Sequence, residues 1–96
     1  MLKIALSAII IGVRSKHAKI LRSVFTKPTP ATLAFADIES LLLGLGATLH
    51  ERKGSRVKFT LGAEEWHAHR PHPGKEAKKY QVESAREFLQ RLEIKP

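Results

Sequence analysis

Apolar side chains recur along this chain with two different spacings, one typical of helices and one typical of strands. Three segments carry apolar residues three and four positions apart, which places them on one face of a helix. These segments predict helices over residues 15–25, 34–45 and 82–92. Between the last two, apolar and polar residues alternate, as they do along a strand with one buried face. The alternation predicts strands over residues 47–52, 55–61 and 64–70.

Turn residues separate the predicted elements. Lys27-Pro28-Thr29-Pro30 ends the first helix, because proline cannot continue a helix, and Gly46 is placed to end the second. Lys53-Gly54 and Gly62-Ala63 separate the strands. The order helix, helix, three-stranded antiparallel meander, helix predicts a two-layer α+β fold with helices covering one face of the sheet. In a chain of 96 residues we expect one domain, over residues 15–96.

The predicted sheet has one apolar face and one basic face. Val57, Phe59 and Trp66 belong to the apolar set that faces the helices. If the apolar sets of all three strands share a face, the opposite face collects cationic and imidazole side chains. These are His50, Arg52, Arg56, Lys58, His67 and His69.

The first 14 residues stand apart from this pattern. The run from Met1 to Val13 is short and strongly apolar. It resembles the apolar region of a signal peptide, but no small-residue cleavage site follows it, and it is shorter than the roughly 20 residues that cross a bilayer. A third interpretation is that Val13 is the true initiator, from a GTG codon. We favour this interpretation and expect residues 1–14 to be an apolar N-terminal extension that is not native to the domain.

Composition favours an anionic partner. The chain has 17 lysines and arginines against 9 acidic residues, a formal net charge of +8. This excess suits RNA, DNA, an acidic protein or a membrane surface, and for so small a domain we favour nucleic acid or an acidic protein. The chain has no cysteines, which excludes disulfides and thiolate metal sites and fits a cytoplasmic location.

Candidate chemistry concentrates where the third strand ends, in the run from His67 to Glu76. Histidine moves protons near neutral pH, and arginine and lysine bind phosphate. The residue types leave three activities open. The histidines can hold a metal ion, although the neighbouring cations disfavour one. A histidine can instead cleave RNA as a general base, or the basic face can bind an RNA backbone without chemistry.

Base stacking is expected to contribute little. Trp66 is predicted in the core, and Tyr80 in a charged link over residues 75–80. Contacts with the RNA backbone and its shape are therefore expected to outweigh the reading of single-stranded bases.

Four short stretches together resemble the HicA family of toxins. They lie within residues 34–94 and are Leu45-Gly46-Ala47, Lys53-Gly54-Ser55-Arg56, His69-Arg70-Pro71-His72-Pro73-Gly74-Lys75-Glu76 and Ser84-Ala85-Arg86-Glu87-Phe88-Leu89. The resemblance implies a fold like the double-stranded RNA-binding domain, α-β-β-β-α, to which residues 15–25 add an N-terminal helix. It also implies a metal-independent, cofactor-free endoribonuclease (an mRNA interferase) that cleaves mRNA, arrests translation and is neutralised by a HicB-like antitoxin.

One position departs from the family's pattern. In HicA proteins the residue after Gly-Ser is usually the catalytic histidine, and here it is Arg56. Arginine stays protonated and cannot act as a general base near neutral pH. We therefore expect His72 or His69 to be the base, with Arg56 as a phosphate contact. The expected RNA-binding residues are Arg52, Lys53, Lys58, Arg70 and Lys75, with no metal ligands. The alternative is a non-catalytic module of the same fold that binds RNA or an antitoxin.

Overall fold

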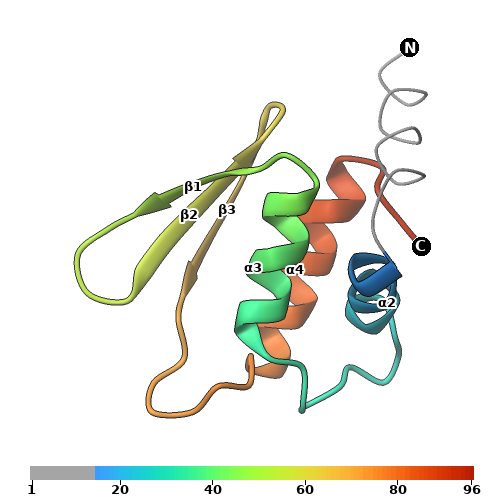
Figure 1. The fold of residues 1–96 in the computed structure, drawn as a ribbon, viewed down its shortest axis with the longest axis horizontal. Helices are drawn as coiled ribbons and strands as arrows, with labels where there is room; N and C mark the ends of the chain where they lie inside the picture. The colour runs from blue at the N-terminus through green and yellow to red at the C-terminus, as the bar shows by residue number, and fades with distance from the viewer. Residues whose placement is uncertain (1–14) are drawn as a thin grey trace.

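The computed structural model describes residues 15–96, and the expectation for residues 1–14 lies outside the described residues. Within this range the chain forms three helices and three strands (Figure 1). They are α2 (Ser15–Val24), α3 (Phe35–Gly44), β1 (Thr48–Glu51), β2 (Arg56–Leu61), β3 (Glu64–His69) and α4 (Lys79–Arg91). The predicted α+β order is confirmed, and the fold is like the double-stranded RNA-binding domain with α2 added in front. No helix within residues 15–96 has the length and apolar character needed to cross a membrane.

The sheet is antiparallel, with β2 in the middle. Its register places Leu49, Phe59 and Trp66 in one line across the strands, and Val57 opposite Ala68. These residues alternate with polar ones, so they share the face that packs against α3 and α4 (Figure 1). The predicted division of the sheet into an apolar and a basic face is therefore confirmed.

Three aromatic rings join the sheet to the helices. Trp66 of β3 stacks on Phe59 of β2 and on Phe35 of α3, with ring centroids 5.6 and 5.9 Å apart. Its indole N–H donates to Ser84 Oγ of α4 at 2.9 Å, so the polar end of this buried side chain also has a partner. Trp66 thereby fixes which face of β3 points inward.

Backbone groups at both ends of α3 find partners. Ala34 provides no side-chain cap at the start, and the Phe35 N–H donates instead to the Lys75 carbonyl at 3.0 Å. At the other end Gly46 has a φ of 101°, and its N–H and that of the next residue return to carbonyls in the last turn of the helix. This Schellman motif confirms Gly46 as the end of the helix, because side chains disfavour such a φ.

α4 begins earlier than the apolar spacing predicts. The sequence predicts a charged link over residues 75–80, but the helix starts at Lys79, within that link. Gln81 explains the earlier start, because its Oε1 accepts a hydrogen bond from the Lys78 N–H at 2.9 Å. Its Nε2 donates to the His69 carbonyl at 2.6 Å, which attaches the first turn of α4 to the end of β3.

α2 lies against α3 and α4 on the side away from the sheet (Figure 1). Arg86 of α4 is buried and holds the segment that follows α2. Its Nε donates to the Val24 carbonyl at 2.8 Å, and its Nη2 donates to the Thr26 carbonyl at 3.3 Å and to Thr29 Oγ1 at 3.0 Å. The connection between α2 and α3 is thus held in place by a side chain from the last helix.

Arg86→Met is expected to lower the free energy of unfolding by about 1–3 kcal/mol, because methionine leaves the buried Val24 carbonyl and the partly buried Thr26 carbonyl without their donor. Urea denaturation followed by circular dichroism measures this loss. Arg91→Met on the same helix is the matched control. Arg91 Nε contacts Glu64 Oε1 at 2.6 Å on the surface, and such a pair contributes about 1 kcal/mol or less. Equal losses in the two variants would contradict the role given to Arg86.

Candidate functional site

The solvent-facing side of the sheet carries a row of three cationic and imidazole side chains at one end. Arg56 of β2 lies opposite His69 of β3. Arg52 continues this line past the end of β1, because its N–H donates to the Arg56 carbonyl at 2.9 Å. We call Arg52, Arg56 and His69 the first row. The structure brings these three together as the strand alternation predicts.

Arg56 and His69 are a closely spaced pair. The Arg70 N–H donates to the Ser55 carbonyl at 2.8 Å, so the neighbouring pair of residues is the hydrogen-bonded one. Such pairs alternate along an antiparallel ladder, and Arg56 and His69 therefore form a non-hydrogen-bonded pair. In pairs of this kind the Cα atoms are about 4.5 Å apart and the side chains are close. The guanidinium of Arg56 and the imidazole of His69 therefore project side by side from the sheet.

A shallow hollow of about 410 Å³ lies over the first row. It is lined by Arg52, Arg56, Val57, His67, Ala68 and His69. Its ionisable groups are two guanidiniums and two imidazoles, which suits an anion such as a phosphate group. Within the described residues, the one polar contact of the Arg56 side chain is a 3.4 Å approach of Nε to the Lys53 carbonyl. The positive charge of the hollow is therefore left available to a ligand.

A second row, His50, Lys58 and His67, lies beside the first and already has an anionic neighbour. Glu65 Oε1 lies 3.1 Å from His67 Nε2, and Glu65 Oε2 lies 3.7 Å from Lys58 Nζ. The hydrogen bond from His67, and next the charge of Lys58, hold the pKa of the Glu65 carboxyl below its usual value of 4.5. Lys58, an expected RNA contact, is thus partly neutralised.

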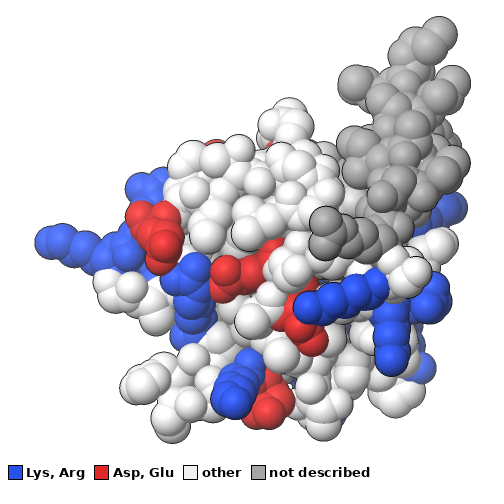
Figure 2. All heavy atoms as spheres, viewed as in Figure 1, with Lys and Arg blue, Asp and Glu red and all other residues white. Residues whose placement is uncertain are grey.

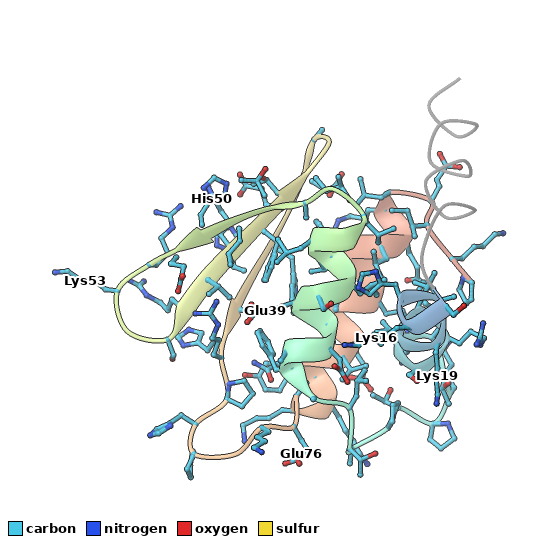
Figure 3. All side chains as sticks on the ribbon, in the orientation of Figure 1. Lys16, Lys19, Glu39, His50, Lys53 and Glu76 are labelled. Atoms are coloured by element: carbon cyan, nitrogen blue, oxygen red, sulfur yellow. The ribbon has the colours of Figure 1, made fainter. Side chains whose placement is uncertain are left out.

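Arg70 points to the other side of the sheet and is bound by two carboxylates. Its Nε and Nη2 donate to the two carboxylate oxygens of Glu39 at 2.7 and 3.2 Å, and its Nη1 donates to Glu51 at 2.7 Å. Figure 3 shows Glu39 on the side of α3 that faces the strands. Its hydrogen bonds to Glu39, and next those to Glu51, raise the pKa of Arg70 above its usual value. To contact RNA as expected, this guanidinium would have to leave both carboxylates.

The structure separates His72 from His69. His72 lines a different hollow, of about 310 Å³, formed by the loop between β3 and α4. That loop is tied to the start of α3, where Lys75 supplies a carbonyl to the helix and the Ala77 N–H donates to the Leu33 carbonyl at 2.8 Å. The side chains of His72 and Lys75 are exposed, and neither lines the hollow over the first row.

Lys53 extends from the tip of the hairpin between β1 and β2 (Figure 3). Figure 2 shows Lys and Arg side chains gathered over this tip and again over α2, with acidic side chains between the two groups. Lys16 and Lys19 belong to the group on α2 (Figure 3). The group at the hairpin tip is the one that borders the first row, and it extends the cationic surface beyond the strands.

Metal ligands are not gathered at this interface. Across residues 15–96, no three His, Asp or Glu side chains come close enough together to hold a metal ion. His67 and His69 project from one face of β3, but the other ionisable groups that line their hollow are Arg52 and Arg56, whose charges repel a cation.

Two residues that border the first row were not among the expected site residues. Gln81 is 4% exposed, and its bond to the His69 carbonyl holds the backbone beside that row. Tyr80, the preceding residue, is exposed in the first turn of α4. Gln81 stands three residues after Lys78, as the Glu or Gln of a capping box does, but lysine lacks the acceptor oxygen that marks an N-cap, so no sequence signal identified this helix start.

The fold and its cationic, imidazole-bearing sheet face define a small basic domain that is built like the double-stranded RNA-binding domain. A family model described as the HicA toxin of bacterial toxin–antitoxin matches residues 35–94, from the first residue of α3 to just beyond α4. The chain therefore belongs to the HicA toxin family, and the resemblance drawn from its sequence is confirmed. No curated protein and no solved structure matched in the two other comparisons.

Arg70→Met is expected to lower the free energy of unfolding by about 1–2 kcal/mol, because hydrogen bonds to two carboxylates are lost at a site partly open to solvent. Urea denaturation measures the change. Arg56→Met is the matched control, since within residues 15–96 that guanidinium contacts only a carbonyl at 3.4 Å, and its effect should stay within about 0.5 kcal/mol. If Arg56→Met proved the more destabilising, the structural role of Arg70 would be wrong.

His67→Ala is expected to raise the pKa of Glu65 toward 4.5, because the imidazole hydrogen bond is the largest cause of its lowering. A carbon-13 NMR titration of the Glu65 carboxyl measures this. A carboxyl whose pKa is lowered by folding stabilises the protein above its unfolded-state pKa, and this stability is lost as pH falls through the folded-state value. Wild-type stability should therefore fall more steeply than that of His67→Ala below pH 4.5. His50→Ala is the control, and a Glu65 pKa that shifts equally there would refute the assignment.

Proposed function

We propose that this HicA-family toxin is a metal-independent endoribonuclease, which cleaves mRNA in the cytoplasm and thereby arrests translation. One observation carries the proposal: Arg56 and His69 form a closely spaced pair in a hollow whose ionisable lining is entirely cationic or imidazole. A phosphate group bound there would meet a proton acceptor and two guanidiniums together.

The family pattern makes this pair significant. Arg56 occupies the position at which HicA proteins usually carry their catalytic histidine, and arginine cannot take up a proton near neutral pH. His69 faces Arg56 across the strand pair, so its imidazole rises beside the position from which the usual histidine would project. We infer that His69 supplies the base and that Arg56 has become a phosphate contact.

His69 suits the role better than His72. His69 shares its hollow with Arg52 and Arg56, whereas His72 lies in the loop after β3 and lines a separate hollow. The loop is held at two points to the segment that begins α3, and His72 does not line the hollow over the first row. A base must stand within hydrogen-bond reach of the proton that it takes, and cations must reach the same phosphate group.

The proposed reaction begins when His69 takes the proton from a 2′-hydroxyl group and that oxygen attacks the adjacent phosphorus. The bond between phosphorus and the 5′ oxygen of the next nucleotide then breaks. One product ends in a 2′,3′-cyclic phosphate, and the departing oxygen takes a proton to become a 5′-hydroxyl group. Arg52 and Arg56 stabilise the negative charge that grows on the other phosphate oxygens. His67 is the second imidazole that lines the hollow and can supply the proton to the departing oxygen.

The same surface supports two partners. Lys53 at the hairpin tip would bind phosphates flanking the cleaved one, and such contacts weaken as salt concentration rises. The family implies an antitoxin partner, and a HicB-like antitoxin with an acidic surface would suit a chain of net charge +8. Binding over the first row would block access of RNA to His69.

A second candidate is a module that binds RNA or its antitoxin without cleavage. Arg56 itself favours this alternative, because the residue expected to act as base in this family is replaced by a side chain that cannot. The two functions share the same surface and differ in whether RNA is cut.

His69→Ala is expected to lower the rate of RNA cleavage by about 100-fold or more, because a general base contributes roughly 10²–10⁴-fold. His72→Ala, the matched control, should change it by less than a few-fold. Purified protein is incubated with end-labelled RNA in the presence of EDTA, and products are separated on denaturing gels. Loss of cleavage in His72→Ala but not in His69→Ala would contradict the assignment of the base. Loss of wild-type cleavage with EDTA would contradict the metal-independent mechanism, and salt-sensitive RNA binding without product would favour the second candidate.

A further inference from the structure

An exposed aromatic side chain stands beside the first row. Tyr80 is 63% exposed and lies in the first turn of α4. Among residues 15–96, the only other large apolar side chain that is exposed is Leu43 of α3. A single exposed apolar side chain is ordinary in a folded protein, so its surroundings decide whether it has a role.

Tyr80 shares its surroundings with the histidines of β3. A small hollow of about 70 Å³ lies between the edge of β3 and the start of α4, and it is lined by Trp66, His67, Ala68, His69, Tyr80, Gln81 and Ser84. The same three residues of β3, from His67 to His69, also line the larger hollow over the first row. The cationic hollow over the first row and the small hollow beside Tyr80 therefore meet along β3.

The position of Tyr80 relative to His69 is fixed by Gln81, the next residue in the chain. The Gln81 Nε2 donates to the His69 carbonyl at 2.6 Å, and its Oε1 accepts from the Lys78 backbone at 2.9 Å. Gln81 is itself buried, so these two bonds hold the first turn of α4 against the end of β3. A ligand that binds at His69 would meet Tyr80 at a defined place.

We propose that Tyr80 is a stacking platform for the base of the nucleotide next to the phosphate bound by the first row. The proposal rests on the RNA-cleaving function proposed above and names its substrate class as single-stranded RNA. An exposed tyrosine ring can stack on any base, but a base within a duplex is already stacked and cannot reach it. Lys78 and Lys79, both exposed at the same helix start, would bind the phosphates on that side.

The size of the small hollow defines how the base would bind. At about 70 Å³ it has room for a few waters and not for a nucleobase. The base would therefore lie on the ring of Tyr80 and would not enter a pocket that selects one base by its hydrogen bonds. Tyr80 is thus a positioning residue, which sets the substrate over His69 with little preference for sequence.

Binding of a short single-stranded RNA with 2′-O-methyl groups, which cannot be cleaved by attack of the 2′ oxygen, tests the proposal. Fluorescence anisotropy should show that Tyr80→Ala weakens binding by about 5- to 100-fold, the range expected for loss of one stacked base. Tyr80→Phe should stay within about twofold, because phenylalanine keeps the ring. Leu43→Ala is the control for removing an exposed apolar side chain elsewhere.

An abasic oligomer of the same length separates stacking from contacts with the backbone. Wild-type protein should bind it about as weakly as Tyr80→Ala binds the normal RNA, and Tyr80→Ala should weaken its binding no further. Tyr80 is the only tyrosine of the chain, so its ring resonances in an NMR spectrum should also move upfield when RNA binds. Unchanged binding in Tyr80→Ala, or an equal loss with the abasic oligomer, would overturn the proposal.

These outcomes are independent of whether the protein cuts RNA. Stacking on Tyr80 without any cleavage of ordinary RNA would support the inference while refuting the endoribonuclease function. Cleavage that depends on His69, with no effect of Tyr80→Ala on binding, would support the endoribonuclease function and refute the stacking role of Tyr80. Tighter binding of a matched duplex than of the single strand would overturn the substrate class.

Discussion

The arrangement of the site depends on the ion pairs of Arg70. This residue directly follows β3, and its guanidinium binds Glu39 of α3 and Glu51 of β1 while its backbone N–H donates to the carbonyl of the residue just before β2. One residue thus connects the end of β3 with α3, with β1 and with the start of β2. Because successive side chains of a strand point to opposite faces, holding Arg70 toward the helices forces His69 toward solvent. A shift of register by one residue would exchange the two, placing a histidine beside the carboxylates and an arginine on the open face.

The net charge of the chain overstates what it offers to an anionic ligand. Arg86 donates to backbone carbonyls at the end of α2 and just after it, Arg70 donates to two carboxylates, and the Lys58 ammonium lies near the Glu65 carboxylate. Each of these cations serves the fold or is partly neutralised. What remains on the sheet is a smaller and better-defined set around Arg52 and Arg56. The location of uncompensated charge, more than its sum, determines where a phosphate group would bind.

The periodicity of the sequence was sufficient to predict the elements, the order of the strands and the two faces of the sheet. These features depend on local spacing, since a strand such as β2 exposes every second side chain whatever surrounds it. The start of α4 was predicted too late because it depends on the amide of Gln81, a polar group that an apolar pattern does not detect. The pairing of Arg70 with Glu39 spans 31 residues of sequence, and no local signal identifies it.

The separation of His69 from His72 likewise could not be predicted, although the two residues are only three apart in the chain. It arises because β3 ends between them and the following loop turns toward α3, where Lys75 caps the helix. If His69 is the base, as proposed, the same geometry gives a physical reason why the imidazole can lie on β3 and not on β2. Two side chains of a non-hydrogen-bonded pair rise from backbones about 4.5 Å apart, closer than two positions along one strand. A histidine on β3 can therefore reach much of the space that a histidine on β2 would fill, and the arginine left on β2 can bind the same phosphate group. Moving the base along β2 would instead carry it about 7 Å from its partners, so the cross-strand exchange is the smaller change.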